Sequence, residues 1–299
     1  MNASVTLLER VLPATVQLQG EVPADHPSAA ILGCERAGSG TVVDSAGLIL
    51  TVQYIVVGAQ SITVTLLDGS ELAGEVAAQD FATGIALVRV DGRKLPVAKL
   101  SASTGLQRGQ EVFIVAALGD NARRVSNGAV SSLDAFDAYW EYRLERAITT
   151  TAVNPGLTGG GLFDGMGHLV GVVSLDLNEV GRFTLAVPVE NFLDHRQELL
   201  RNGRRTTRPP RAWVGLYCYT WRGRLIIAGV LPGTPAESGG LKAGDVLLTV
   251  DGREVTGRAA LYQLLWAHSP GDTIACTVFR SDEIKPLAIC AGDAEAFFA

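Results

Sequence analysis

Along the first two thirds of the chain, hydrophobic and polar residues mostly alternate, which is the pattern of half-buried β-strands. Ile62, Val64 and Leu66 alternate with threonines, and Asp68-Gly69 then offers a tight turn into residues 71–76, so this stretch predicts a β-hairpin. We expect further short strands at residues 40–43, 85–90, 111–116, 147–153, 169–174 and 183–187. Many short strands at this spacing are typical of antiparallel barrels or sandwiches.

The last third of the chain has a mixed pattern. A helix is expected over residues 189–202, because apolar positions recur among charged ones until Gly203. Residues 201–211 then carry five arginines and two prolines and no large apolar residue, which favours a solvated linker over a basic patch that binds an anion. Beyond it we expect strands at 214–219, 225–230, 245–250 and 272–280 and helices at 236–239 and 258–268.

Composition narrows the function classes. A chain of 299 residues suggests two domains, and 47% hydrophobic with 19% charged residues excludes wholesale disorder. The net charge of −6 argues against a protein that mainly holds nucleic acid or an anionic membrane. The cysteines and histidines are scattered and the glycine-rich stretches lack nucleotide-binding patterns, so neither a metal nor another cofactor is expected.

The start of the chain bears on its compartment. Glu9 and Arg10 are the first charged residues, and no basic segment precedes an apolar stretch of the kind that secretory signals have. No apolar run approaches the length of a transmembrane helix. We therefore expect the chain to stay in the cytoplasm.

The segment ahead of the linker contains a series of blocks in a fixed order. They are Gly38-Ser-Gly-Thr-Val-Val-Asp44, Gly47-Leu-Ile-Leu-Thr51, Val56-Val-Gly-Ala59, Leu95-Pro-Val-Ala-Lys-Leu100, Asn154-Pro-Gly156, Leu162, Gly171-Val-Val173 and Ala186-Val-Pro188. This series resembles the trypsin-like protease domain of the HtrA-type serine proteases. The resemblance implies a mainly β fold, a double β-barrel.

The segment after the linker resembles the PDZ domain that follows in the same family. The resemblance rests on Trp213-Val-Gly-Leu216, Val230-Leu-Pro-Gly-Thr-Pro-Ala236, Gly240-Leu-Lys-Ala-Gly-Asp-Val246, Asp251-Gly-Arg-Glu-Val255 and Pro270-Gly-Asp272. It implies a protease-like domain over 1–200, a linker over 201–212, a PDZ-like α+β domain over 213–294 and an apolar tail over 295–299.

The positions that correspond to the family's catalytic triad carry other residues here. The histidine of the family's Thr-Asn-Asn-His-Val-Val block corresponds to Tyr54, and the aspartate of Thr-Asp-Leu-Ala-Val-Leu corresponds to Gly84. The serine of Asn-Pro-Gly-Asn-Ser-Gly-Gly corresponds to Thr158, with Gly156 at the oxyanion-loop position. A phenol is a poor proton acceptor at neutral pH, and glycine orients nothing. No catalytic residue is therefore expected.

These replacements predict a catalytically inactive scaffold or adaptor. Two alternatives stay open: an active endopeptidase that uses Thr158 with an unconventional base, and a holdase that binds unfolded chains without cutting them. A base within reach of Thr158 would support the first alternative, and promiscuous binding would support the second. His168 lies in a turn-like stretch and is a weak candidate for a relocated base.

The PDZ-like segment predicts binding of C-terminal or extended peptides. PDZ-like domains add such a peptide as a strand to a sheet edge. By the resemblance, the loop Trp213-Val214-Gly215-Leu216 receives the terminal carboxylate, and the strand that continues through Tyr217 and Cys218 pairs with the peptide. Leu261, Leu264 and Leu265 would line the groove or, alternatively, belong to the core.

The end of the chain offers a possible internal partner. Phe297 and Ala299 would face the same side of a strand, so the tail could occupy a PDZ-like groove, although capping the domain's core is the simpler interpretation. A homotrimer is implied only by the family resemblance.

Overall fold

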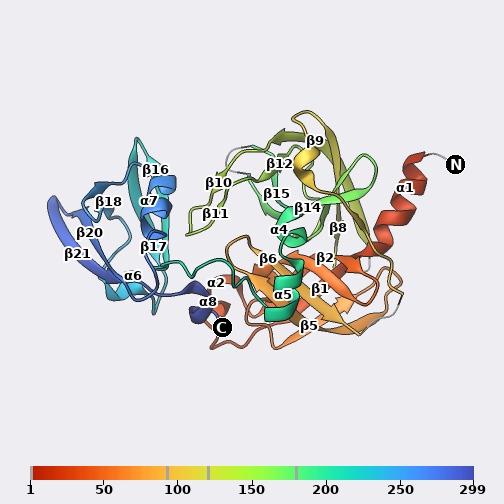
Figure 1. Ribbon diagram of the computed structural model, residues 1–299, viewed down its shortest axis with the longest axis horizontal. Helices are drawn as coiled ribbons and strands as arrows, with labels where there is room; N and C mark the ends of the chain where they lie inside the picture. The colour runs from red at the N-terminus through yellow and green to blue at the C-terminus, as the bar shows by residue number, and fades with distance from the viewer. Residues whose placement is uncertain (1–2, 92–93, 120–121, 179–180) are drawn as a thin grey trace. The chain divides into compact units, whose positions relative to one another are not determined.

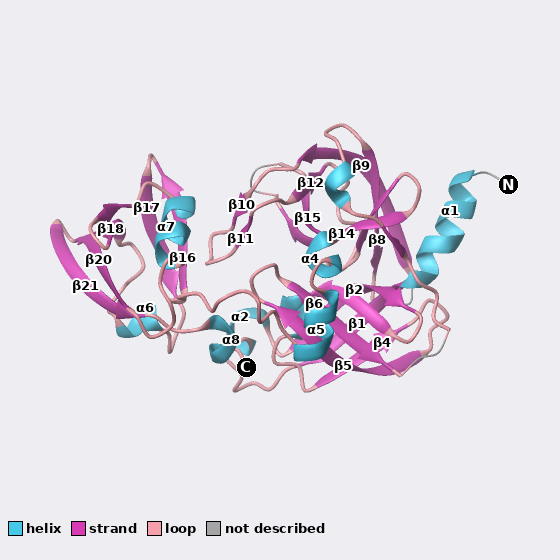
Figure 2. Ribbon diagram, viewed as in Figure 1, coloured by secondary structure: helices cyan, strands magenta, loops and turns pink. Residues whose placement is uncertain are grey.

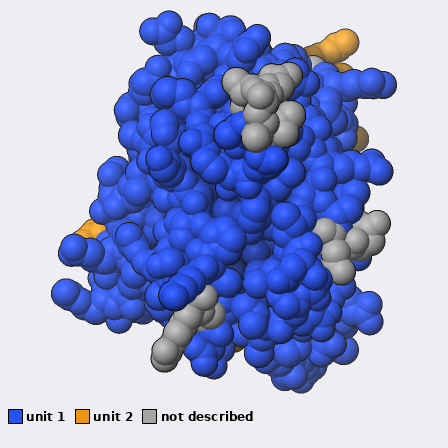
Figure 3. All heavy atoms as spheres, turned by 90° about the vertical axis from the view of Figure 1, so that its right-hand side faces the viewer, with its two compact units in different colours: residues 1–135, 145–206 blue, residues 136–144, 207–299 orange. Residues whose placement is uncertain are grey.

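The computed structural model describes residues 3–91, 94–119, 122–178 and 181–299. The chain divides into two compact units, residues 1–135 with 145–206 and residues 136–144 with 207–299, which Figure 3 colours separately. The units differ from the predicted domains in one respect. Residues 136–144, which precede the expected linker by more than fifty positions, belong to the second unit because their contacts are with it.

The first unit begins with a closed antiparallel barrel (Figure 1). Its strand order is β1-β2-β3-β6-β5-β4, and alternate side chains of each strand point into the barrel. The strands are β1 (Thr15–Glu21), β2 (Glu35–Asp44), β3 (Leu48–Val52), β4 (Ser61–Thr65), β5 (Glu71–Asp80) and β6 (Ile85–Val90). The predicted hairpin is β4 and β5, whose register pairs Val64 with Leu72.

A second sheet of the first unit has the order β13-β8-β9-β12-β15-β14-β7, and pairing of β13 with β14 closes it. Its strands are β7 (Lys99–Leu100), β8 (Glu111–Ala117), β9 (Arg123–Ser132), β12 (Ile148–Thr150), β13 (Gly161–Asp164), β14 (His168–Asp176) and β15 (Thr184–Pro188). A buried cluster that includes Ile114, Ile148, Leu162 and Val173 fills it. The mainly β, two-barrel fold class is thus confirmed (Figure 2).

Short helices connect these strands. They are α1 (Ala3–Val11), a 3-10 turn at Leu12–Ala14, α2 (Ala29–Leu32), α3 (Gln53–Val56), a 3-10 turn at Ser103–Gly105, α4 (Glu190–Leu193) and α5 (Arg196–Asn202). The single helix expected over 189–202 is therefore two helices, because His195 leaves helical geometry at φ −119° and ψ 8°. Gly203 ends α5 in the left-handed conformation.

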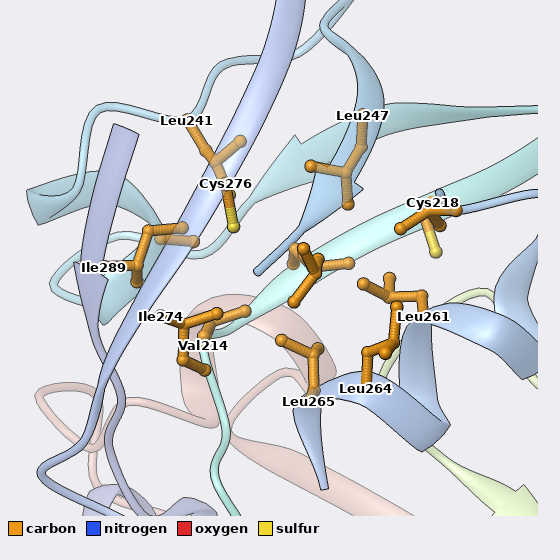
Figure 4. Packing of buried hydrophobic residues seen from close by; sticks show 14 of the residues in the cluster. Val214, Cys218, Leu241, Leu247, Leu261, Leu264, Leu265, Ile274, Cys276 and Ile289 are labelled. Carbon is orange, nitrogen blue, oxygen red and sulfur yellow. The ribbon is translucent and has the colours of Figure 1, made fainter. Parts of the chain in front are cut away.

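The second unit is a sheet of order β16-β17-β18-β20-β21 with short helices beside it. It comprises β16 (Leu216–Trp221), β17 (Arg224–Val230), α6 (Pro235–Ser238), β18 (Val246–Val250), β19 (Arg253–Glu254), α7 (Arg258–Leu265), β20 (Thr273–Arg280), β21 (Glu283–Cys290) and α8 (Ala294–Phe297), together with β10 (Phe136–Asp137) and β11 (Arg143–Leu144). Figure 4 shows its core, where Leu261, Leu264 and Ile274 converge.

Within the described parts of the chain, every helix is too short or too polar to cross a bilayer.

Candidate functional site

The first half of the candidate site is the junction between β3 and α3, where Tyr54 lies. The N–H of Gln53 donates to the carbonyl oxygen of Gly84 at 2.8 Å, so the positions that correspond to the histidine and aspartate of the triad are adjacent. The buried guanidinium of Arg36 donates to the Tyr54 carbonyl oxygen at 3.0 Å and to that of Val57 at 2.7 Å. These bonds fix the short helix that carries Tyr54.

The second half of the site is the turn that carries Thr158. The N–H of Ser39 donates to the Thr158 carbonyl oxygen at 2.6 Å, and the Ser39 hydroxyl donates to that of Leu157 at 2.7 Å. Gly159 follows at φ +88°, and a Cβ there would lie 2.2 Å from the Ser39 carbonyl oxygen. The turn therefore requires glycine at this position and holds Thr158 against β2.

The two halves meet through their hydroxyl groups. The Tyr54 hydroxyl donates to the Ser174 carbonyl oxygen at 2.6 Å and is hydrogen-bonded to the Thr158 side chain. Burial raises the pKa of the Tyr54 phenol, the hydrogen bond from Thr158 opposes this, and the charge of Asp176 raises the pKa further. Tyr54 therefore stays protonated at neutral pH and can pass a proton on but cannot hold the negative charge.

Asp176, at the end of β14, is a carboxylate whose charge acts on the Tyr54 phenol, and the sequence interpretation missed it. Partial burial raises the pKa of Asp176, and hydrogen bonds from Thr184 and Asn154 oppose that rise. The Thr184 hydroxyl lies 3.4 Å from Asp176 Oδ1. The strand predicted from the sequence ended at Ser174, whereas β14 extends to Asp176, so the sequence pattern did not bring Asp176 into the site.

His168, considered from sequence as a relocated base, lies at the opposite end of β14 from Asp176. Six residues of strand separate it from Ser174, which is roughly 20 Å at about 3.3 Å per residue. Its Nδ1 is 3.2 Å from Asp164 Oδ2. His168 is therefore not part of this site.

In the loop before Thr158, backbone N–H groups already face hydrogen-bond acceptors of the protein itself. Gly156 requires the absence of a side chain, since a Cβ would lie 2.3 Å from the Ala117 carbonyl oxygen. Its N–H faces Asn154 Oδ1 at 3.4 Å, and the Leu157 N–H donates to the Ala117 carbonyl oxygen at 2.8 Å. The expectation that Gly156 marks an oxyanion loop thus stays a prediction.

In the second unit, the expected carboxylate loop does hold a carboxylate. The N–H groups of Val214, Gly215 and Leu216 donate to Glu141, at 2.9 Å to Oε1 and at 2.7 and 3.1 Å to Oε2. Gly215 takes φ +83°, and a Cβ there would lie 2.6 Å from the Thr234 side chain. Three converging amides are thus the anion site of this unit.

Trp213 was also expected to help hold the carboxylate, but its backbone N–H and its indole ring make other contacts. Its N–H donates to the Gly292 carbonyl oxygen at 3.0 Å. Its ring centroid is 4.9 Å from that of Phe297 and 5.8 Å from that of Phe298. The proposed occupation of the peptide groove by the C-terminal tail is therefore not what the structure shows, because the apolar tail covers this indole instead.

The remaining predicted peptide-binding residues divide between an edge and the core. Tyr217 and Cys218 lie on β16, the edge strand of the sheet, where the Cys218 N–H donates to the Tyr139 carbonyl oxygen at 2.6 Å. Leu261, Leu264 and Leu265 are buried in the hydrophobic core together with Val214, Leu216 and the Cys218 thiol (Figure 4). The core interpretation of these leucines agrees with their burial.

Comparison with protein families gives two matches. Residues 38–172 match the family described as "Trypsin-like peptidase domain", and residues 198–290 match the family described as "PDZ domain". Together they cover most strands of the two barrels and the PDZ-like sheet.

Comparison with individual proteins agrees. The chain is 31% identical over 274 residues to a "Probable periplasmic serine endoprotease DegP-like" of Halomonas elongata, covering 86% of this chain and 56% of that protein. It is 27% identical to a "Putative serine protease HhoA" of Synechocystis sp., covering 84% and 69%. The chain thus spans little more than half the length of its DegP-like relatives.

Solved structures extend the likeness to nearly the whole chain. A structure titled "HtrA-type protease AlgW with decapeptide" is 25% identical, with a TM-score of 0.58 and coverage of 97% and 98%. The serine endoprotease from Yersinia pestis is 22% identical, with a TM-score of 0.58 and 98% coverage of both chains, and shows the fold alone.

These comparisons contradict two predictions. The chain was predicted to be catalytically inactive, but its relatives are named as probable serine endoproteases and a putative serine protease. That prediction considered the residue types at three positions and not the hydroxyl pair and carboxylate that the fold assembles around them. The chain was also predicted to be cytoplasmic, but relatives are named periplasmic. That prediction depended only on the residue pattern at the start of the chain.

Proposed function

We propose, from the premise that this chain belongs to the HtrA-type family of trypsin-like peptidases with a PDZ domain, that it is an endopeptidase whose nucleophile is Thr158. The observation that carries the proposal is the hydrogen bond between the Thr158 and Tyr54 side chains, together with the charge of Asp176, which acts on the Tyr54 phenol. The relatives named serine endoproteases support it.

In this mechanism Thr158 Oγ1 attacks the carbonyl carbon of the scissile peptide. Its proton passes to the Tyr54 hydroxyl oxygen as the Tyr54 proton turns from the Ser174 carbonyl to the Asp176 carboxylate, which is the base. The proton then returns along the same path to the leaving amine, and water hydrolyses the acyl-enzyme with the same groups. The raised pKa of Asp176 makes it a stronger base than an ordinary aspartate.

The proposal sets an expected rate. Loss of a histidine base from a Ser-His-Asp site costs about 10⁴ in turnover. We therefore expect turnover roughly 10⁴ lower than that of a Ser-His-Asp relative, which calls for long incubations and sensitive detection.

The test is cleavage of unfolded casein by the purified chain, followed by mass spectrometry of the products. Thr158→Ala is expected to abolish cleavage, whereas Thr206→Ala, the same change in an exposed stretch before the second unit, should leave it intact. Thr158→Ser restores a less crowded hydroxyl and should cleave faster. Cleavage that persists in Thr158→Ala, or its absence from the wild-type chain, would contradict the proposal.

The second unit supplies a peptide-binding function in the same proposal. Its match to the PDZ family and the three converging amides of residues 214–216 support recognition of a peptide carboxylate. A relative's structure is titled with a bound decapeptide. We expect micromolar binding, as for a single added strand.

The relatives' names also bear on the compartment. We propose that the chain works in the periplasm, as the name of the Halomonas elongata relative states for that protein. Cell fractionation with antibody detection tests this, and recovery of the chain only with cytoplasmic markers would contradict it.

A further inference from the structure

The loop that should receive a ligand's carboxylate already holds one from the chain itself. The Glu141 side chain accepts from three successive N–H groups, those of Val214, Gly215 and Leu216, at 2.7–3.1 Å. Glu141 is 73 positions before the first of these donors. Both partners belong to the second unit, so the contact is internal to it.

The residues before Glu141 lie along β16 in the way an added strand would. Trp140 forms an antiparallel bridge with Tyr217, and the Cys218 N–H donates to the Tyr139 carbonyl oxygen at 2.6 Å. The direction from Tyr139 to Glu141 thus runs toward the carboxylate loop and opposite to β16. A peptide whose C-terminus sits in that loop would have the same direction.

Helix α7 completes the contact from the other side. The Tyr262 hydroxyl lies 2.7 Å from the Ala138 carbonyl oxygen and 2.5 Å from that of Trp140. The segment is held in shape by its own hairpin, in which β10 pairs with β11 and Arg143 forms an ion pair with Asp137 at 2.6 Å. Residues 138–141 therefore pair with β16 through their backbone, accept hydrogen bonds from the Tyr262 hydroxyl and place the Glu141 carboxylate in the amide loop.

We propose that residues 138–141 are an internal ligand of the PDZ domain, with the Glu141 carboxylate in place of a terminal carboxylate, and that a protein with a free C-terminus binds by displacing them. This inference deepens the proposed peptide-binding function and depends on it. The displaced segment lies in the chain between β9 and β12 of the trypsin-like unit, so its release would also free the connection between these two strands.

The electrostatics make the internal ligand replaceable. Burial raises the pKa of Glu141 to about 7, despite the three hydrogen bonds that lower it. The charge is thus held at a cost, because it is buried and the three N–H groups that donate to it are neutral. An α-carboxylate has an ordinary pKa near 3.5 and brings the same two oxygens in a fully charged form at neutral pH.

The test is titration of a fluorescent peptide with an apolar, free C-terminus into the full chain. Glu141→Ala empties the amide loop, so the peptide should bind roughly tenfold or more tightly to it than to the wild type. Glu254→Ala removes an equal charge from exposed β19 of the same unit and should bind as the wild type does. Amidated peptide should bind weakly to all three.

Each outcome has a distinct meaning. Equal affinity for wild type and Glu141→Ala would overturn the internal ligand and leave peptide binding standing. No binding even to Glu141→Ala would overturn both. Tryptophan fluorescence checks folding, since all four tryptophans lie in the second unit, and Glu141→Gln is the second variant if alanine unfolds it. Hydrogen exchange of residues 136–144 should rise when peptide is added to the wild type, and unchanged exchange would also overturn the proposal.

Discussion

Gly159 illustrates how closely the Thr158 turn is packed. A Cβ there would lie 2.2 Å from the Ser39 carbonyl oxygen and 2.6 Å from Thr51 Oγ1, and the φ of +88° disfavours any side chain. We predict that Gly159→Ala lowers the free energy of unfolding by about 2–5 kcal/mol. Gly105→Ala is the control, because a Cβ there meets nothing within 4 Å.

This prediction is checked by urea unfolding followed by circular dichroism, since the tryptophans report on the second unit alone. An unfolding midpoint for Gly159→Ala that equals that of Gly105→Ala would show that the turn relaxes easily around a side chain.

Asp176 gives the proposed reaction a pH dependence. Because its pKa lies above the ordinary value of 3.8, the carboxylate that accepts the proton forms only as the pH rises through that raised pKa. Activity should therefore increase with pH across the acidic range. Asp176→Asn should abolish this rise of activity with pH and lower turnover by roughly 10²–10⁴.

Tyr54→Phe tests the proposed proton path at Tyr54, since it keeps the ring but removes the hydroxyl that would pass the proton from Thr158 to Asp176. It should lower turnover by a similar factor, whereas Tyr219→Phe, at an exposed tyrosine of the second unit, should not. Casein cleavage across a pH series measures both. If the activity of Asp176→Asn still rises with pH across the acidic range as that of the wild type does, Asp176 is not the base.

At the scale of elements, strands with clear alternation were predictable and others were not. The hairpin of β4 and β5 was predicted within a few residues because alternation and an Asp-Gly turn coincide there. β9 was missed because its burial does not alternate regularly, so its residues lack the two-residue period. The expected helix over 189–202 was interrupted at His195, whose backbone geometry no local pattern signals.

The candidate sites show the same division. Tyr54, Gly84 and Thr158 could be located by motif, because each belongs to a short block with a recognisable order. Asp176 and Glu141 could not, because their roles depend on contacts between distant parts of the chain, and no local period reports such contacts. The carboxylate loop was predictable from Gly215, but its occupant was not.

The hairpin formed by β10 and β11 gives an element-scale pH prediction. Burial raises the pKa of Glu141 from its ordinary value of 4.5 to about 7 when the segment is docked, so the docked state binds more protons. Docking is therefore strongest below pH 4.5 and weakens as the pH rises through 7. The wild-type chain should bind peptide roughly tenfold more weakly at pH 5.5 than at pH 7.5.

The other titratable groups near Glu141 do not account for the predicted pH dependence of peptide binding. Burial raises the pKa of Tyr262 on α7, and it raises the pKa of Cys218 on β16 to about 11, so neither titrates in this range. Glu141→Gln should therefore bind the peptide with equal affinity at pH 5.5 and pH 7.5. If its affinity still depends on pH, a group other than Glu141 causes the pH dependence.

At the scale of the whole molecule, the chain joins a trypsin-like unit, for which we propose a hydroxyl-based site, to a PDZ unit, for which we propose an internal ligand. Two connections of the chain link them besides the expected one near residue 206, because the segment 136–144 leaves the first unit and returns to it. A domain boundary drawn along the sequence alone misses this exchange, since it assumes that each unit is one continuous stretch.

The central claim is that Thr158 is a nucleophile, and covalent labelling tests it most directly. The full chain is incubated with a fluorophosphonate, and the adduct is located by intact mass and peptide mapping. The account predicts one adduct, on the peptide that contains Thr158, absent from Thr158→Ala and formed much more slowly in Tyr54→Phe. An unlabelled wild-type chain, or an adduct that remains in Thr158→Ala, would contradict it.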